Sequence, residues 1–374
     1  MRIAVFCNDF WPTIGGVQTG VWGLARALGR HGHRTIVLTR QPTDLPPVEV
    51  VDDVEVRRFR WNLRPHTSFP VRALRSGAQV LHTVRQWRPS VIFVHFVSVH
   101  ALYAWMCAES IGVPMILSFR GNDALRIAER SWINRVVYRL LARAADVSLF
   151  CSPWLRDQTR GTRWFRGVGG RVGLLEDAVE VSHREPVPPS VPPYVLAAGR
   201  LVPKKGFDML LRAWAAVGAR IPAELWIAGD GPEDVSLREL ASEIGLGRRV
   251  RFLGAVPHAR LLGLLEQAAL CIVPSREEPY GIIIVEAQAL GVPVLACAVG
   301  NTPCLIHDGV TGYLADPTAE GLARGLVRAW IDPGRSTVAA EARTAPGAVR
   351  TYDAMAQELE GWVSLVTGPA PGRC

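Results

Sequence analysis

The sequence predicts an α/β protein made of two doubly wound domains, and three observations lead to this prediction. Short β-branched, apolar runs alternate with helical patterns of about 10 to 15 residues, which is typical of right-handed βαβ units around a buried parallel sheet. The alternation occurs twice along the 374 residues, and a proline-rich segment divides the two series. A chain of this length also exceeds what one hydrophobic core usually serves.

The first series predicts an N-terminal domain over residues 1–184. Its strands are expected at residues 3–6, 35–39, 91–96, 115–119 and 147–150. Residues 89–108 contain no Asp, Glu, Lys or Arg over 20 positions, which is the nominal length of a membrane span. This stretch divides into the strand at 91–96 and a helical pattern at 101–110, so we expect a buried strand and a helix there instead of a span.

The second series predicts a C-terminal domain over residues 195–351. Its strands are expected at residues 195–198, 224–228, 251–253, 270–273 and 293–296. Residues 185–194 hold five prolines, which favour an extended, semi-rigid linker. A last amphipathic helical pattern, residues 352–374, is expected to pack back on the N-terminal domain. Because ligands of open parallel sheets bind beyond the carboxyl ends of the strands, the expected site is a cleft between the two domains.

Composition excludes several classes of protein. The chain is 49% hydrophobic and 20% charged, which excludes a disordered protein and a disulfide-rich miniprotein. Its seven cysteines are an odd number without a CxxC pair, so neither a disulfide framework nor a zinc site is expected. The first apolar run is too short for a signal peptide. We therefore expect a protein of the reducing cytoplasm.

Charge is distributed unevenly along the chain. Residues 1–184 hold 25 basic and 14 acidic side chains, whereas residues 185–374 hold 17 and 20. Residues 56–108 contain eight arginines and no acidic residue. Within this stretch, an apolar helical stripe is flanked by arginines, and its members are Val71, Leu74, Ala78, Leu81 and Val84. The pattern fits a helix on the anionic inner face of a membrane, a phosphorylated acceptor, or an ordinary helix packed on the sheet with solvated arginines.

One polar cluster follows the strand at 270–273. Glu277 and Glu278 lie in a loop, and Pro279-Tyr280-Gly281 opens a helix that ends near Gly291. The first amides of a helix lack intrahelical partners, so Tyr280, Gly281 and Ile282 mark a candidate phosphate site. Glu278 and Glu286 flank it and are suited to accept hydrogen bonds from sugar hydroxyls. The alternative is a solvated loop and a surface glutamate, but Glu286 stands in an apolar helix and needs a partner there.

A second cluster carries positive charge. Arg200 directly follows a strand, and Lys205 lies at the entry to the next helix. Two cations at this position could neutralise a pyrophosphate. Lys204 and Lys205 are the two lysines among 42 basic residues, which favours a need for a compact ammonium group over an ordinary surface turn. Gly15 and Gly16, after the first strand, would let backbone amides approach a ligand closely.

These clusters resemble a known family. Together with Ile-Ala-Gly-Asp-Gly-Pro at 227–232 and Asp-Gly-Val-Thr-Gly-Tyr-Leu at 308–314, they are similar to the retaining glycosyltransferases of family 4, the glycosyl transferases group 1. The resemblance covers the whole chain and is strongest from 195 to 330. In the N-terminal half, Gly15-Gly16 and Ser-Phe-Arg-Gly-Asn-Asp at 118–123 carry it. It implies the GT-B fold, with two Rossmann-like domains.

The resemblance also implies an activity. A retaining hexosyltransferase would move a sugar from a nucleoside-diphosphate-sugar on the C-terminal domain to an acceptor hydroxyl on the N-terminal domain, in cell-envelope glycan, glycolipid or secondary-metabolite biosynthesis. Glu278 would contact the donor sugar and Glu286 the ribose. Arg200 and Lys205 would bind the diphosphate, near the helix start at 280–282, and Gly16 would belong to the N-terminal glycine loop.

The chain departs from the family pattern at two places. Arg120 stands where many members have a His near the donor C6 hydroxyl, and Glu176-Asp177-Ala178-Val179 replaces Asn-Gly-Val-Asp. No Asp-x-Asp motif accompanies the expected cleft, and Arg200 and Lys205 supply cations, so neither a metal nor a further cofactor is expected.

Other functions compete with this interpretation. A sugar-nucleotide epimerase or a phosphorylase would use the same architecture. The basic N-terminal half could indicate nucleic-acid binding, but no recognition motif accompanies the charge. We therefore expect no nucleic-acid partner. A dehydrogenase is disfavoured because no G-x-G-x-x-G follows the first strand. The sequence leaves open the donor base, the sugar, the acceptor and the oligomeric state.

Overall fold

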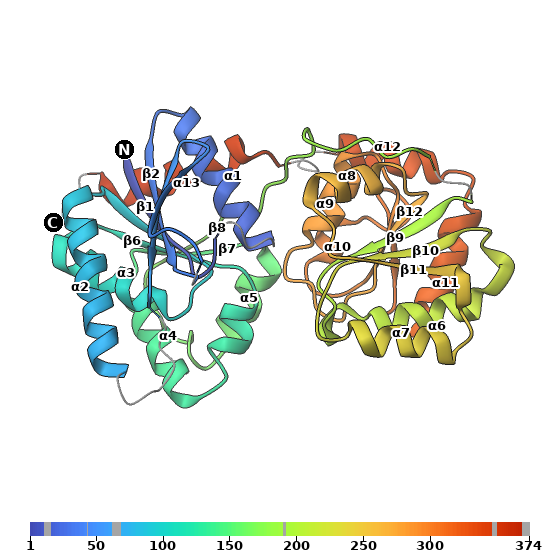
Figure 1. Ribbon diagram of the computed structural model, residues 1–374, viewed down its shortest axis with the longest axis horizontal. Helices are drawn as coiled ribbons and strands as arrows, with labels where there is room; N and C mark the ends of the chain where they lie inside the picture. Colours follow the sequence, from blue (N-terminus) through green and yellow to red (C-terminus); the bar gives the residue numbers. More distant parts are fainter. Residues whose placement is uncertain (11–15, 43, 62–68, 190–191, 346–349, 369–374) are drawn as a thin grey trace. The chain divides into compact units, whose positions relative to one another are not determined.

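The chain forms two compact α/β units. The computed structural model describes residues 1–10, 16–42, 44–61, 69–189, 192–345 and 350–368. Unit 1 comprises Met1–Ala178 together with Thr351–Cys374, and unit 2 comprises Val179–Arg350 (Figure 1). Each unit has a predominantly parallel sheet covered by helices, so the predicted fold class of two doubly wound domains is confirmed.

The sheet of unit 1 has eight strands in the order β3-β4-β2-β1-β5-β6-β7-β8. Their bounds are β1 Arg2–Phe6, β2 Arg34–Arg40, β3 Val48–Val51, β4 Val54–Phe59, β5 Val91–His95, β6 Met115–Phe119, β7 Val147–Phe150 and β8 Arg171–Leu174. All pairings are parallel except that of β3 with β4. Every residue of β5, β6 and β7 is buried, as expected for central parallel strands. The strand order reverses between β1 and β5, where open sheets bind ligands.

Helices cover both faces of this sheet. Their bounds are α1 Gly16–Arg30, α2 Phe69–Trp87, α3 His100–Ile111, a π-helical turn at Asp123–Ile127, α4 Trp132–Ala144, α5 Pro153–Gly161 and α13 Tyr352–Thr367. α1 and α13 share one apolar cluster with the sheet. α3 contacts α2 and α4. Ser131 and Ser152 cap α4 and α5 by accepting hydrogen bonds from backbone amides, which fixes where these helices begin.

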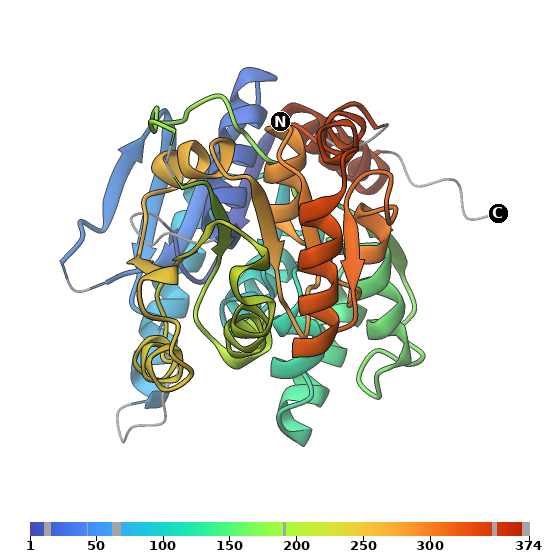
Figure 2. The same ribbon diagram turned by 90° about the vertical axis from the view of Figure 1, so that its right-hand side faces the viewer.

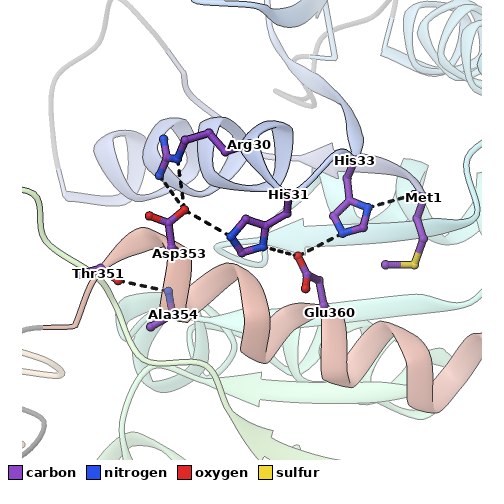
Figure 3. A network of polar contacts seen from close by, with 8 residues as sticks. All are labelled: Met1, Arg30, His31, His33, Thr351, Asp353, Ala354 and Glu360. Carbon is purple, nitrogen blue, oxygen red and sulfur yellow. Dashed lines mark hydrogen bonds and ion pairs between the residues drawn. The ribbon is translucent and has the colours of Figure 1, made fainter.

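The C-terminal helix α13 is held in unit 1 by a polar network and by packing. Asp353 and Glu360 of α13 face Arg30, His31 and His33, which lie at and just after the end of α1 (Figure 3). The second ring nitrogen of His33 lies 2.9 Å from the N-terminal amine, and Figures 1 and 2 both draw the N-terminus beside α13. A Cβ at Gly23 of α1 would lie 2.3 Å from the ring of Tyr352, so a glycine allows this close approach. α13 is thus part of unit 1.

The sheet of unit 2 is wholly parallel, in the order β11-β10-β9-β12-β13-β14. Its strands are β9 Tyr194–Ala198, β10 Glu224–Ala228, β11 Val250–Gly254, β12 Leu270–Val273, β13 Val294–Cys297 and β14 Tyr313–Ala315. Its α-helices are α6 Phe207–Val217, α7 Asp234–Glu243, α8 His258–Glu266, α9 Ile282–Ala289, α10 Thr302–Leu305, α11 Ala319–Ile331 and α12 Arg335–Thr344. Short 3₁₀ turns lie at Pro203–Lys205, Gly218–Arg220 and Gly247–Arg249. The strand order reverses between β9 and β12.

The division between the units lies earlier than the predicted boundary at 184. The described part of the proline-rich segment packs on unit 2, because the amide of Glu185 donates to the carbonyl of Ala259 at 3.0 Å and Val187 packs against an apolar cluster. Gly263 makes this contact possible, since a Cβ there would lie 1.9 Å from the carbonyl oxygen of Glu185.

The prediction of which residues form the apolar stripe around 71–84 is only partly confirmed. α2 buries Val80, Val84 and Trp87, whereas Ala78 is exposed. The reason is that Gly77 faces Tyr103 and Met106, with a Cβ position 3.5 Å from both side chains, and this contact turns α2 toward α3. The side chains of Val71 and Leu74 lie outside the described residues. Among the helices that the structure describes, none combines the length and the apolar character that crossing a membrane requires.

Candidate active site

The start of α9 forms the centre of the site. Gly281 precedes the helix with φ 108°, a conformation that favours glycine, and a Cβ there would lie 2.9 Å from the side chain of Leu305. Asn301 holds the preceding loop, because its backbone amide donates to the carbonyl of Glu278 at 2.9 Å and its side-chain amide donates to that of Tyr280 at 3.2 Å. The first amides of α9, at and after Ile282, therefore occupy a fixed position with the positive end of the helix dipole.

Glu278 lies at this helix start and contacts Lys205. Its side chain is buried, and one carboxylate oxygen accepts from Lys205 Nζ at 2.6 Å and from Ser275 Oγ at 2.9 Å. A buried carboxylate requires such partners, since its desolvation is otherwise costly. The other oxygen accepts no hydrogen bond within the described parts of the chain, so it is available to a ligand hydroxyl.

Glu286 lies one to two turns further along α9 and has the partner that its apolar surroundings demand. His258 Nε2, in the first turn of α8, lies 2.7 Å from Glu286 Oε1. The hydrogen bond to Glu286 raises the pKa of His258, and the charge of the carboxylate adds to this, while burial opposes it. Sequence reasoning missed His258, because it belongs to no motif and its only signal was that Glu286 needs a partner.

The loop after β9 brings Lys205 to this place. Gly206 has φ 68°, and a Cβ there would lie 2.1 Å from the carbonyl oxygen of Pro274, so only glycine lets this turn rest on the end of β12. The carbonyl of Lys204 also accepts the amide of Arg276 at 2.8 Å. Arg200 is exposed just after β9, and its guanidinium forms no hydrogen bond or ion pair with the residues that the structure describes. Because β9 and β12 are neighbours, Arg200 and Glu278 follow adjacent strand ends at one edge of the sheet.

Close contact between two loops explains why residues 229 and 231 are glycines. A Cβ at Gly229 would lie 1.9 Å from the carbonyl oxygen of Gly199, and one at Gly231 would lie 2.3 Å from that of Leu201. The loops after β10 and β9 therefore touch through their backbones, which supports the position of the Arg200 segment.

Arg120 follows β6 in unit 1 and is buried. Its Nη1 donates to the carbonyl of Leu175 at 2.8 Å and to Asp177 Oδ1 at 2.9 Å, while Nε and Nη2 are buried without a partner among the described residues. The two departures from the family pattern thus contact each other. Asp123 shapes the loop, because its carboxylate accepts backbone amides from Val97, Arg120, Gly121 and Ala124. Burial raises the pKa of Asp123 to about 6 against these hydrogen bonds.

His95, the last residue of β5, completes a polar cluster with Arg120 and Asp177. It is fully buried, and neither ring nitrogen has a hydrogen-bond partner in the described regions. A Cβ at Gly20 of α1 would lie 3.8 Å from His95 Nε2 and 3.7 Å from Asp177 Oδ1. Burial, followed by the charge of Arg120, lowers the pKa of His95 well below its ordinary value, so the ring is neutral. Sequence reasoning treated His95 only as part of a strand.

The predicted site residues thus fall into two groups. Lys205, Glu278, Glu286 and Arg200, with the helix start at 280–282, belong to unit 2. Arg120 and Gly16 belong to unit 1, where Gly16 begins α1, and Gly15 lies outside the described residues. Within the described residues, no three His, Cys, Asp or Glu side chains are grouped to hold a metal ion.

Two family models match the chain. Residues 15–168 match a glycosyl transferase 4-like domain, and residues 179–344 match the glycosyl transferases group 1. Among curated relatives, glycogen synthase of Mycobacterium tuberculosis is 27% identical over 370 residues, which covers 89% of this chain and 87% of the relative. A D-inositol 3-phosphate glycosyltransferase of Actinosynnema mirum is 29% identical over 372 residues, with coverage of 86% and 85%.

Solved structures share the fold over nearly the whole chain. Sucrose-phosphate synthase of Thermosynechococcus elongatus superposes with a TM-score of 0.81 at 22% identity, covering 97% of this chain and 98% of that one. Anabaena HepE in complex with UDP and glucose superposes with a TM-score of 0.79 at 21% identity, covering 98% and 100%. Both comparisons agree with the architecture of two doubly wound units.

Proposed function

This chain belongs to the group 1 glycosyltransferases of family 4, with the GT-B fold, and on that premise we propose that it is a retaining hexosyltransferase that uses a nucleoside-diphosphate-sugar. The observation that carries the proposal is the contact of Lys205 with Glu278 at the start of α9. This contact brings together an ammonium group, a carboxylate that can accept a hydrogen bond from a sugar hydroxyl, and helix amides without intrahelical partners. A sugar linked to a diphosphate requires these three kinds of group.

Each residue has a separate task in this proposal. The diphosphate rests on the first amides of α9, with Arg200 and Lys205 neutralising its charge. The free oxygen of Glu278 accepts a hydrogen bond from the donor sugar, and the free oxygen of Glu286 accepts one from the ribose. His258 holds Glu286 in place from the other side.

The reaction follows a front-face course. The acceptor oxygen forms a bond to the anomeric carbon on the face from which the diphosphate leaves, and a diphosphate oxygen takes the acceptor proton. Positioning and charge stabilisation then supply the catalysis. Arg200 and Lys205 provide the positive charge, so the proposed reaction needs neither a divalent metal nor another cofactor.

The proposed reaction fits several donor bases and biosynthetic settings. HepE is described in complex with UDP and with UDP-glucose, which makes a UDP-hexose the first donor to test. The acceptor would bind on unit 1, in the synthesis of an envelope glycan, a glycolipid or a secondary metabolite. The six described cysteines are all free, which supports a reducing cytoplasm.

The test is release of nucleotide from UDP-, GDP-, ADP- and dTDP-sugars, with and without a panel of acceptors, followed by NMR assignment of the product anomer. We expect release that depends on the acceptor and a product with the donor's anomeric configuration. An inverted product would contradict the retaining course. Conversion of the donor without any acceptor would favour an epimerase, and a requirement for inorganic phosphate would favour a phosphorylase.

A further inference from the structure

Helix α4 of unit 1 presents an apolar face to solvent. Four of its large apolar side chains are exposed: Trp132 by 68%, Ile133 by 54%, Val136 by 48% and Leu140 by 46%. Trp132, Val136 and Leu140 are spaced four residues apart, so they form one stripe along the helix. Scattered apolar residues are ordinary on a protein surface, whereas a contiguous stripe indicates an interaction site.

The opposite face of α4 is anchored in unit 1, so the helix cannot turn its exposed stripe toward the core. Tyr138, Leu141 and Ala142 are buried. The hydroxyl of Tyr138 donates to the carbonyl of Val97 at 2.7 Å, and Ser131 caps the helix by accepting the amide of Asn134 at 3.1 Å. α4 lies beside α3 at the periphery of the unit (Figure 1). Rotation to hide the stripe would break these contacts.

Positive charge borders the stripe. Arg135, Arg139 and Arg143 follow one another at intervals of four, and the helix contains no acidic residue. Arg135 pairs with Glu129 before the helix at 3.4 Å, whereas Arg139 and Arg143 form no ion pair with the described residues. In the wider segment 126–171 there are ten arginines and three acidic residues. A helix with an exposed Trp, aliphatic side chains and flanking arginines matches the requirements of the boundary between lipid headgroups and acyl chains.

We propose that α4 is the surface by which this protein binds a membrane leaflet that contains anionic lipid. The aliphatic side chains and Trp132 enter the headgroup boundary, and Arg139 and Arg143 pair with lipid phosphates. This assigns the contact to α4 instead of α2, because the described apolar side chains Val80, Val84 and Trp87 of α2 point into the unit. The inference does not depend on the proposed transferase reaction.

Co-sedimentation with vesicles tests the proposal on the full chain. We expect the protein to pellet with phosphatidylcholine vesicles that contain phosphatidylglycerol, to stay in the supernatant with pure phosphatidylcholine, and to be released by high salt. The double variant Trp132→Ser/Leu140→Ser should lose roughly tenfold in partitioning. Arg139→Gln/Arg143→Gln should lose most of the binding to the anionic vesicles.

Matched controls keep the result specific. Val235→Ser and Ile331→Ser remove apolar side chains in unit 2 that are exposed by 66% and 69%, and both should bind like the wild type. Circular dichroism checks that every variant is folded. Failure of the folded wild type to bind anionic vesicles would overturn the proposal, as would equal binding by Trp132→Ser/Leu140→Ser. Concentration-dependent dimerisation in light scattering that this same variant abolishes would assign the stripe to a second copy instead.

Discussion

At the scale of single residues, the ion pair of Lys205 with Glu278 determines how the site is charged before a ligand arrives. The carboxylate holds the ammonium group at 2.6 Å, next to the helix start that we assign to the diphosphate. The free carboxylate oxygen can accept from a sugar hydroxyl without breaking this pair. In the proposed reaction Lys205 therefore has two tasks, to hold Glu278 and to bind phosphate.

Replacement of Glu278 should therefore reduce turnover more than stability. Glu278→Gln keeps the shape but removes a charge-assisted hydrogen bond of about 1.5–3 kcal/mol, so we expect kcat/KM for the donor to fall by roughly ten- to a hundredfold. Lys205→Ala should weaken nucleotide binding more than acceptor binding. Nucleotide-release kinetics and calorimetry measure the two effects. Glu239→Gln, on the exposed face of α7, is the control, and full activity of Glu278→Gln would contradict the site.

The pair of His258 with Glu286 predicts a pH dependence of stability. The hydrogen bond raises the folded-state pKa of His258 above the ordinary value of 6.5. The stabilisation is therefore fully present below about pH 6.5 and is lost as the pH rises through the higher, folded-state pKa. Urea unfolding of the wild type and of His258→Gln across this range should show a difference that shrinks with increasing pH. A difference that does not change with pH would rule out this linkage.

Arg120 and Asp177 should be coupled. Removing one partner of a buried ion pair leaves an uncompensated charge and costs roughly 3–5 kcal/mol, whereas removing both costs less. We expect Asp177→Gly and Arg120→His each to destabilise unit 1, and the double variant, which restores the family pattern at both positions, to be more stable than the sum of the single changes predicts. Chemical denaturation of all four proteins gives the coupling energy. Simple additivity would show that the two departures are independent.

At the scale of elements, a helix or strand is predicted well when its signal is local, and poorly when its position depends on contacts with residues far away in the sequence. The central strands were predicted because each is a continuous apolar run, and the start of α9 was predicted because Pro279 and Gly281 mark it. β3, β4, β8 and β14 were not predicted. Charged residues or a glycine interrupt β3, β4 and β8, and β14 has only three residues. The orientation of α2 depends on Gly77 meeting Tyr103, a contact that no local pattern encodes.

The docking of α13 on α1 also depends on distant partners, and its contacts should differ in strength. Glu360 meets both His31 at 2.7 Å and His33 at 3.1 Å, and these three side chains are largely buried. Asp353 meets Arg30 at 2.9 Å and His31 at 3.3 Å, but Asp353 and Arg30 are about half exposed, so solvent weakens their attraction. We expect Glu360→Gln to lower the free energy of unfolding of unit 1 by about 1–2 kcal/mol, and Asp353→Asn by less than about 1 kcal/mol. Urea denaturation compares the two, and the reverse order would contradict this account.

At the scale of the whole molecule, the two doubly wound units follow from the repeated strand–helix alternation, but their boundary does not. Proline content predicted a linker at 185–194, whereas Glu185 and Val187 pack on unit 2 through a contact with the distant Gly263 and its neighbours. The same limit applies to the site. The glutamates and cations have motif positions, but His258 and His95 belong to no motif and reach their partners only through the fold.

Ligand binding to the whole protein tests whether the cations of unit 2 replace a metal. A ligand that binds only the folded state, at one hundred times its Kd, stabilises it by about 2.7 kcal/mol, which for a unit of this size corresponds to roughly 5–10 °C in Tm. We expect UDP, or whichever diphosphate the donor panel identifies, to raise the Tm equally with EDTA and with magnesium. Lys205→Ala should abolish most of the Tm shift, because its ammonium group is the cation that contacts the buried carboxylate of Glu278. The control Arg248→Gln, on a turn away from the site, should keep the full Tm shift. A shift that appears only with magnesium would show that a metal, and not Arg200 and Lys205, neutralises the diphosphate.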